Sequence, residues 1–196
     1  MGSIKKLANE IQLGISQTFP ALREVLKRNL PLAIAAMLEA RTANLAVLAN
    51  YLPLELTRGD LREQWSSRLL SNKFLDSGYM MRPFAMRALQ EASKFSRVIQ
   101  LSMDQTDIGN RFAILFISLR IGGRALPLAW KVEQGAANIG FEGQAELLEQ
   151  VLPWIPKGAQ VMLLADRFYP SEGLLELISC AQNSQPVPQF STPLRI

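Results

Sequence analysis

The chain has 196 residues, of which 48% are hydrophobic and 19% are charged, and its formal net charge is +4. This composition excludes a disordered chain, because enough apolar surface is present to form a core. Histidine is absent and cysteine occurs once, which excludes a Ser-His-Asp triad, a His-ligated zinc site and an intramolecular disulfide. Any metal ion must therefore be held by oxygen ligands, which favours magnesium, manganese or calcium.

The first half of the chain has sequence features that are typical of α-helices. Apolar residues recur at helical intervals, and Pro31 is predicted to interrupt the pattern. Thr42 and Asp60 are the predicted N-caps of later helices, and Pro83 suits the first turn of the last one. Residues 1–95 are therefore predicted to form a helical domain.

The spacing of apolar residues changes near residue 97, from a helical pattern to short apolar runs. Three apolar runs predict three consecutive antiparallel strands, and Gly122-Gly123 predicts a tight turn between the last two. A helix, a fourth strand that stops at Asp166, and another helix follow. The predicted elements are strands at 98–103, 111–121 and 126–132, a helix at 140–152, a strand at 161–165 and a helix at 170–179. Residues 181–196 are rich in Pro, Ser and Gln and are predicted to be a disordered tail.

Charge is unevenly spread along the chain. Residues 1–100 have a net charge of +6, and residues 101–196 have a net charge of −2. This asymmetry predicts one part that binds a polyanion and one part built around carboxylates, although a helical half with solvated Lys and Arg would give the same balance. No apolar run approaches the roughly 20 residues of a membrane helix, so we expect a cytoplasmic protein without membrane contact.

Two aspartates follow apolar runs that are predicted to be strands. Asp104 follows the first run and Asp166 follows the fourth. If these strands are neighbours in one sheet, both carboxylates emerge near the same edge and repel each other unless a cation lies between them. Magnesium is the natural candidate. The alternative is that each aspartate only ends a strand or caps the next helix.

Several segments together resemble the DDE transposases of bacterial insertion sequences. The resemblance lies in Met-Asp-Gln-Thr-Asp at 103–107, in residues 111–130, and in Leu-Leu-Ala-Asp-Arg-Phe-Tyr at 163–169. It is strongest to the branch with Asp-x-Thr and Asp-Arg signatures, and residues 39–49 and 62–74 resemble the N-terminal region of such enzymes. The order of three antiparallel strands, helix, strand and helix is that of the RNase H-like fold. The fold class expected is thus α+β/α/β, with a helical DNA-binding domain at 1–95 and a partial RNase H-like core at 96–180.

The resemblance implies that Asp104 and Asp166 are the first two catalytic acids and hold Mg²⁺ or Mn²⁺. In the family, the third acid is a glutamate on a later helix, within a pattern of Tyr, Arg, Glu and Lys that this sequence lacks. The expectation is therefore a truncated or frameshifted transposase that is inactive alone. The alternative is a non-catalytic DNA-binding or dimerising remnant that inhibits a full-length transposase.

Arg62, Ser66 and Lys73 are the candidate DNA contacts. Their spacing places them on one helical stripe, from which they could reach phosphates of double-stranded DNA at the ends of the element. A solvated helix face is the alternative for these three residues. The expected partners are this DNA and either a second copy of the chain or a full-length transposase.

Overall fold

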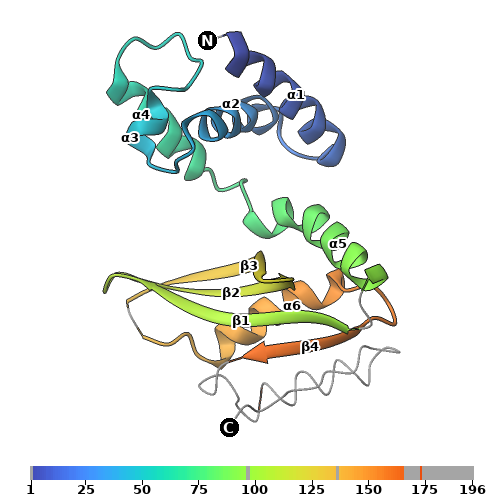
Figure 1. Cartoon of the computed structure of the whole chain (residues 1–196). Coiled ribbons are helices and arrows are strands. Elements are labelled where there is room, and N and C mark those ends of the chain that lie inside the picture. Colours follow the sequence, from blue (N-terminus) through green and yellow to red (C-terminus); the bar gives the residue numbers. More distant parts are fainter. Residues whose placement is uncertain (1, 96–97, 136, 166–172, 174–196) are drawn as a thin grey trace. The chain divides into compact units, whose positions relative to one another are not determined.

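The computed structural model describes residues 2–95, 98–135, 137–165 and 173. Within these residues the chain is mixed α/β, with six α-helices, one short 3₁₀-helix and one four-stranded sheet (Figure 1). The chain divides into two compact units, of which the first ends at Asp76 and the second begins at Ser77. The predicted order of helices followed by a mixed sheet is confirmed.

The first unit contains four helices. They are α1 (Gly2–Thr18), α2 (Glu24–Ala40), α3 (Leu45–Ala49) and α4 (Gly59–Leu70). Small apolar clusters hold them together: one joins α1 to α2 and another joins α2 to α3 and to the segment that follows α3. The buried members are Ile4, Ala8 and Ala35 in the first cluster and Ala36, Leu48 and Leu52 in the second.

Three helix boundaries in this unit differ from the sequence prediction. Helix α2 continues through Pro31, because one missing N–H is outweighed by burial of the residues around it. Asn44, and not Thr42, caps α3, since its side-chain oxygen accepts the N–H groups of the second and third residues of that helix. Helix α4 begins at Gly59, so Asp60 lies inside the first turn.

The second unit is built on the sheet. It contains α5 (Ser77–Phe95), β1 (Val98–Ile108), β2 (Phe112–Ile121), β3 (Arg124–Gln134), α6 (Phe141–Val151), the 3₁₀-helix η1 (Leu152–Trp154) and β4 (Gln160–Ala165). The strand order is β3-β2-β1-β4, with β1, β2 and β3 antiparallel in sequence and β4 parallel to β1. The three predicted antiparallel strands are thus confirmed. Gly122, with a φ of 59°, forms the tight turn predicted between β2 and β3.

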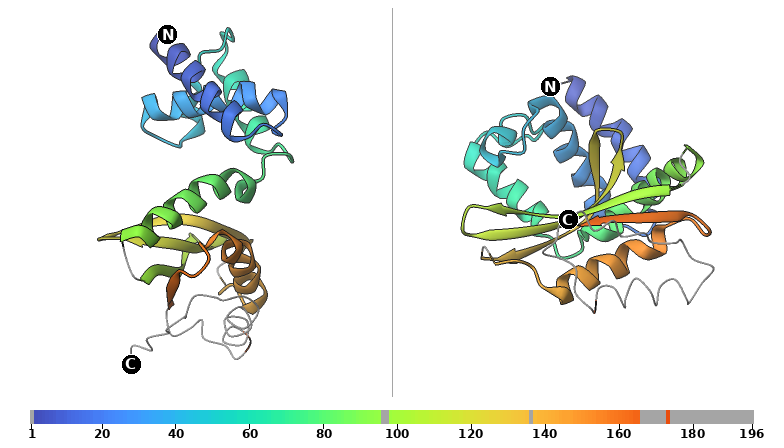
Figure 2. Two further views of the ribbon diagram at one scale, coloured as in Figure 1. Left: turned by 90° about the vertical axis from the view of Figure 1, so that its right-hand side faces the viewer. Right: turned by 60° about the horizontal axis from the view of Figure 1, so that its bottom comes forward.

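Helices α5 and α6 lie on opposite faces of the sheet (Figure 2). Ala85 and Leu89 of α5 belong to the same core as Leu101 of β1, Leu115 of β2 and Leu147 of α6. The sequence grouped residues 77–95 with the helical half of the chain. Packing instead joins α5 to the sheet, which moves the boundary between the units to Asp76.

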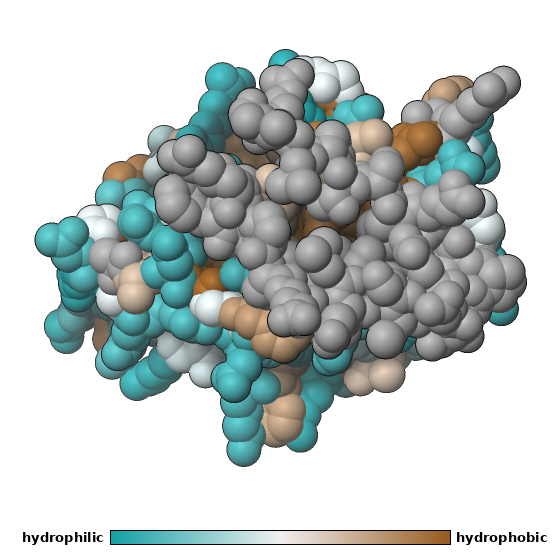
Figure 3. Space-filling model, turned by 90° about the horizontal axis from the view of Figure 1, so that it is seen from below, coloured by the Kyte–Doolittle hydropathy of each residue, from teal (hydrophilic) through white to brown (hydrophobic). Residues whose placement is uncertain are grey.

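The surface of α6 that points away from the sheet is acidic. Its exposed residues include Glu142, Glu146 and Glu149, and the described residues in Figure 3 are mostly hydrophilic, with smaller apolar patches. No helix in the described ranges has the length and apolarity to cross a membrane. The predicted helix at 170–179, apart from Gly173, and the predicted tail at 181–196 lie outside the described residues.

Candidate functional site

Strands β1 and β4 are neighbours, as the sequence argument about the two aspartates required. They pair in parallel, and the last pair of the register joins Met103 to Ala165. Asp104 comes directly after Met103 in the sequence, and Asp166 comes directly after Ala165. Asp166 itself lies outside the described residues, so only the strand that leads to it is placed.

Asp104 lies within β1 and not at its end. The predicted strand end is wrong here because residues 105–108 continue to pair with β2, and Asp104 itself pairs with Phe116. Alternation along the strand buries Met103, which is 2% exposed, and exposes the carboxylate of Asp104. One oxygen of that carboxylate, Oδ1, accepts the backbone N–H of Gln105 at 3.0 Å.

The neighbours of Asp104 on its face of the sheet are aromatic. The register aligns Asp104 of β1 with Phe116 of β2, and Phe116 with Trp130 of β3. Both rings are half-buried. The surroundings of this carboxylate are therefore exposed and partly apolar.

Gln105 and Asp107 point to the opposite face and are engaged there. The Oε1 atom of Gln105 accepts the N–H of Ile139 at 2.9 Å, and its Nε2 donates to Asp107 at 3.1 Å. These contacts fix the loop that precedes α6 against β1. Asp107, three residues after Asp104, is thus a partner of Gln105 and does not share the face of the candidate site.

Of the two carboxylates predicted to hold a metal ion, the structure describes only that of Asp104. Magnesium and manganese both take carboxylate oxygens, and Mg²⁺ is usually bound through one or two carboxylates together with phosphate oxygens of the substrate. Asp104 offers an exposed carboxylate of this kind. In the described part of the chain, no three Asp, Glu, His or Cys side chains form a group that could hold a metal ion.

A lysine near α6 has a perturbed pKa. Lys131 of β3 forms an ion pair with Glu146 of α6, and the hydrogen bond that Lys131 donates to this glutamate raises the pKa of Lys131 above its ordinary value. The charges of Glu146, Glu133 and Glu142 act in the same direction. Lys131 therefore stays protonated and joins β3 to α6.

Arg62, a predicted DNA contact, has a structural role in the first unit. Its guanidinium donates to four backbone carbonyls, one at the end of α3 and three in the segment that connects α3 to α4. The acceptors are Leu56 at 2.6 Å, Leu54 at 3.1 Å, Leu52 at 3.2 Å and Ala49 at 3.3 Å. These bonds occupy most of the five N–H donors of the arginine, so little remains for a phosphate.

Ser66 and Lys73 do not form the predicted helical stripe with Arg62. Ser66 is 2% exposed and donates its hydroxyl to the carbonyl of Arg62, one turn earlier. Helix α4 ends at Leu70, so Lys73 lies beyond it. The expectation of one shared stripe is therefore wrong, and of these three residues Lys73 alone is exposed.

Lys73 instead belongs to a cluster that the sequence analysis did not identify. The ring of Phe74 lies 3.1 Å from the guanidinium carbon of Arg23 and 5.1 Å from the Nζ atom of Lys73. We call these three residues the Phe74 cluster. The adjacent Lys73 and Phe74 gave a weak signal of a basic and aromatic surface, but nothing in the sequence linked them to Arg23.

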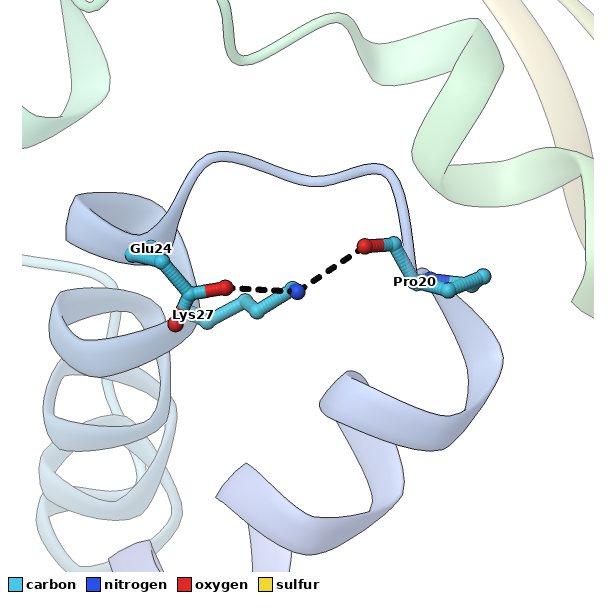
Figure 4. Close-up of polar contacts among 3 residues, drawn as sticks. All are labelled: Pro20, Glu24 and Lys27. Carbon is cyan, nitrogen blue, oxygen red and sulfur yellow. Dashed lines mark hydrogen bonds and ion pairs between the residues drawn. The ribbon is translucent and has the colours of Figure 1, made fainter.

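The loop that carries Arg23 is fixed by a neighbouring lysine. The Nζ atom of Lys27 donates to the carbonyl of Pro20 at 2.9 Å and to the carboxylate of Glu24 at 2.8 Å (Figure 4). These contacts tie the connection between α1 and α2 to the first turn of α2. Arg23 is the residue just before α2, so its backbone is held from both sides.

Comparison of the chain with protein-family models, with curated proteins and with solved structures gives no match. The sequence motifs and the geometry above are therefore the basis for assigning a function.

Proposed function

We propose that this chain is part of a DNA transposase of the DDE type, with an RNase H-like core in its second unit. In this proposal, the first unit binds double-stranded DNA. The second unit contributes Asp104 and Asp166 to a site at which phosphodiester bonds are cleaved and joined. The intact enzyme would use water and then a DNA 3′ hydroxyl as the attacking groups.

The observation that carries the proposal is the pairing of Met103 with Ala165. Each of these residues precedes one of the two aspartates, and the strands that contain them are parallel neighbours. The strand order β3-β2-β1-β4, with three antiparallel strands and a parallel fourth, also supports an RNase H-like core. The motifs at 103–107 and 163–169 add the resemblance to transposases.

Asp104 and Asp166 would hold Mg²⁺ or Mn²⁺ in this proposal. When bound, such an ion supplies positive charge that stabilises a phosphoryl-transfer transition state and activates an oxygen for attack. The chain's own part is to present two carboxylates from adjacent strands. The backbone N–H of Gln105 donates to the Oδ1 atom of Asp104 and helps to orient that carboxylate.

Charge supports the assignment of DNA binding to the first unit. Residues 1–76 contain ten Lys and Arg against seven Asp and Glu. Arg58, Arg62 and Lys27 are engaged in bonds within the unit, and other basic side chains, such as Lys73, lie exposed on its surface. Phosphates neutralised by such cations release counterions, so the affinity should depend strongly on salt.

The experiment is a titration of a labelled DNA duplex of mixed sequence with the full chain over a series of salt concentrations. We expect binding whose logarithmic affinity falls linearly with the logarithm of salt concentration. A chain that binds no DNA at low salt would overturn the proposal. Magnesium-dependent strand transfer, measured in parallel, separates an active enzyme from a DNA-binding remnant.

A further inference from the structure

We propose that the Phe74 cluster, formed by Arg23, Lys73 and Phe74, is a contact surface for the DNA backbone, with Phe74 holding the two cations in position for phosphates. The inference rests on the proposed DNA-binding function and specifies the surface that carries it. It replaces the stripe of Arg62, Ser66 and Lys73 that the sequence predicted.

The cluster brings together residues from distant parts of the sequence. Arg23 precedes α2, whereas Lys73 and Phe74 follow α4, and the ring of Phe74 contacts both cations. All three side chains are exposed, Phe74 at 39%. Two positive charges that converge on one exposed ring repel each other, and a bound anion relieves that repulsion.

The stacking leaves the donors of Arg23 free for a ligand. A guanidinium that lies on an aromatic ring uses its face for the cation–π contact, while its five N–H groups point outward in the plane. Among the described residues, no hydrogen bond or ion pair engages this guanidinium. A planar fork of this kind matches the geometry of two phosphate oxygens.

The acidic residue next to Arg23 in the sequence is paired with Lys27. This residue is Glu24, and its carboxylate binds Lys27 at 2.8 Å (Figure 4). The same lysine holds the carbonyl of Pro20 and so fixes the loop that leads to Arg23. Lys27 thus both binds the carboxylate of Glu24 and positions the loop.

Lys73 and Phe74, the other two residues of the cluster, lie in an ordered turn. The carbonyl of Leu69 accepts the N–H of Asn72, and the side-chain oxygen of Asn72 accepts the N–H of Phe74 at 3.0 Å. A further bond runs from the N–H of Leu75 to the carbonyl of Asn72 at 2.8 Å. This turn fixes the backbone at Lys73 and Phe74, so a phosphate would meet two cations whose backbones are already ordered.

The test uses the full chain and a labelled DNA duplex of mixed sequence, with binding measured over a range of salt concentrations. Arg23→Ala and Lys73→Ala are each expected to reduce the slope of log affinity against log salt by about 0.9, the value for one lost phosphate contact. Phe74→Leu, which keeps apolar volume but removes the aromatic face, is expected to weaken binding without changing net charge. Arg58→Ala is the control, because it removes the same charge from an exposed pair with Asp60.

The results distinguish this inference from the proposed function. If the natural chain binds DNA but Arg23→Ala and Lys73→Ala change the slope no more than Arg58→Ala does, the Phe74 cluster is not the contact surface. That result would leave the proposed function standing. If the natural chain binds no DNA duplex, both the proposed function and this inference fail. Circular dichroism of each variant shows whether the helices remain folded.

Discussion

Met103 of β1 and Ala165 of β4 are paired in parallel strands, and each is followed in the sequence by an aspartate. This register links two motifs that are far apart in the chain. The carboxylate of Asp104 lies on the exposed face of β1, next to half-buried Phe116. The proposed site for a divalent cation rests on this pairing of the two strands.

Replacing Arg62 with alanine should destabilise the first unit. The change leaves carbonyl acceptors of the segment 49–56 without their donor, and we expect a loss of about 2–3 kcal/mol of unfolding free energy. Urea unfolding followed through a fluorine label on Trp65, which packs in this unit, measures the loss. Arg58→Ala, which breaks an exposed pair, should cost less than about 1 kcal/mol. Equal effects of the two substitutions would show that the carbonyl contacts of Arg62 are not structural.

Gly143→Ala should destabilise the second unit because α6 packs tightly at this residue against Ile139, which lies just before the helix. An added Cβ would lie 2.4 Å from Cγ2 of Ile139 and 3.2 Å from Cδ of Lys131. Overpacking of this kind costs about 1–3 kcal/mol. Thermal unfolding of the full chain tests this, with Gly123→Ala as the control, since a Cβ at Gly123 meets open space. A Gly143→Ala chain as stable as the control would contradict the close packing.

The pair between Lys131 and Glu146 should make stability depend on pH in the alkaline range. The pKa of Lys131 is raised in the folded chain, chiefly by its hydrogen bond to Glu146. Its contribution is therefore complete below the ordinary value of 10.5 and is lost as the pH rises through the higher folded value. Glu146 is largely exposed, so the contribution should be less than about 1 kcal/mol. The free energy of unfolding of Glu146→Gln should differ from that of the natural chain at pH 8, and the two values should converge at strongly alkaline pH. A difference in unfolding free energy that persists at strongly alkaline pH would count against the ion pair.

Much of the second unit follows from local sequence patterns. The strand alternation, the Gly122-Gly123 turn and the apolar run before Asp166 predicted the strands, whereas the adjacency of β1 and β4 was a condition of the argument about the two aspartates that the register meets. The extension of β1 beyond Asp104 was not predictable, because it depends on pairing with β2 and not on the residues of β1 alone.

The candidate contacts of the first unit were less predictable. The spacing of Arg62 and Ser66 on a helix suggests a surface, but spacing alone does not reveal that the carbonyls at the end of α3 and after it surround the guanidinium. Likewise, the contact of Arg23 with Phe74 depends on how α2 and the segment after α4 fold onto each other. Long-range packing decides both cases.

The 196-residue chain alone should be a poor strand-transfer enzyme. In the proposed function it contributes Asp104 and Asp166, but its sequence lacks the Tyr, Arg, Glu and Lys pattern that carries the third acid in DDE transposases. A misplacement of about 1 Å at a reacting centre can cost on the order of 100-fold in rate, so an incomplete ligand set should abolish most activity. The assay contains the chain, Mg²⁺ or Mn²⁺ and a DNA duplex. Robust cleavage that disappears in Asp104→Ala would show that another residue supplies the third acid.

The most direct test of the account is paramagnetic broadening by Mn²⁺ in nuclear magnetic resonance spectra of the full chain. We expect broadening centred on residues 104 and 166, at manganese concentrations that indicate weak binding, and its loss when Asp104→Asn and Asp166→Asn are combined. Asp107→Asn is the control, because Asp107 binds Gln105 on the other face of the sheet and should leave the broadening unchanged. Broadening that occurs only elsewhere, or that persists in the double variant, would contradict a shared metal site at these two aspartates.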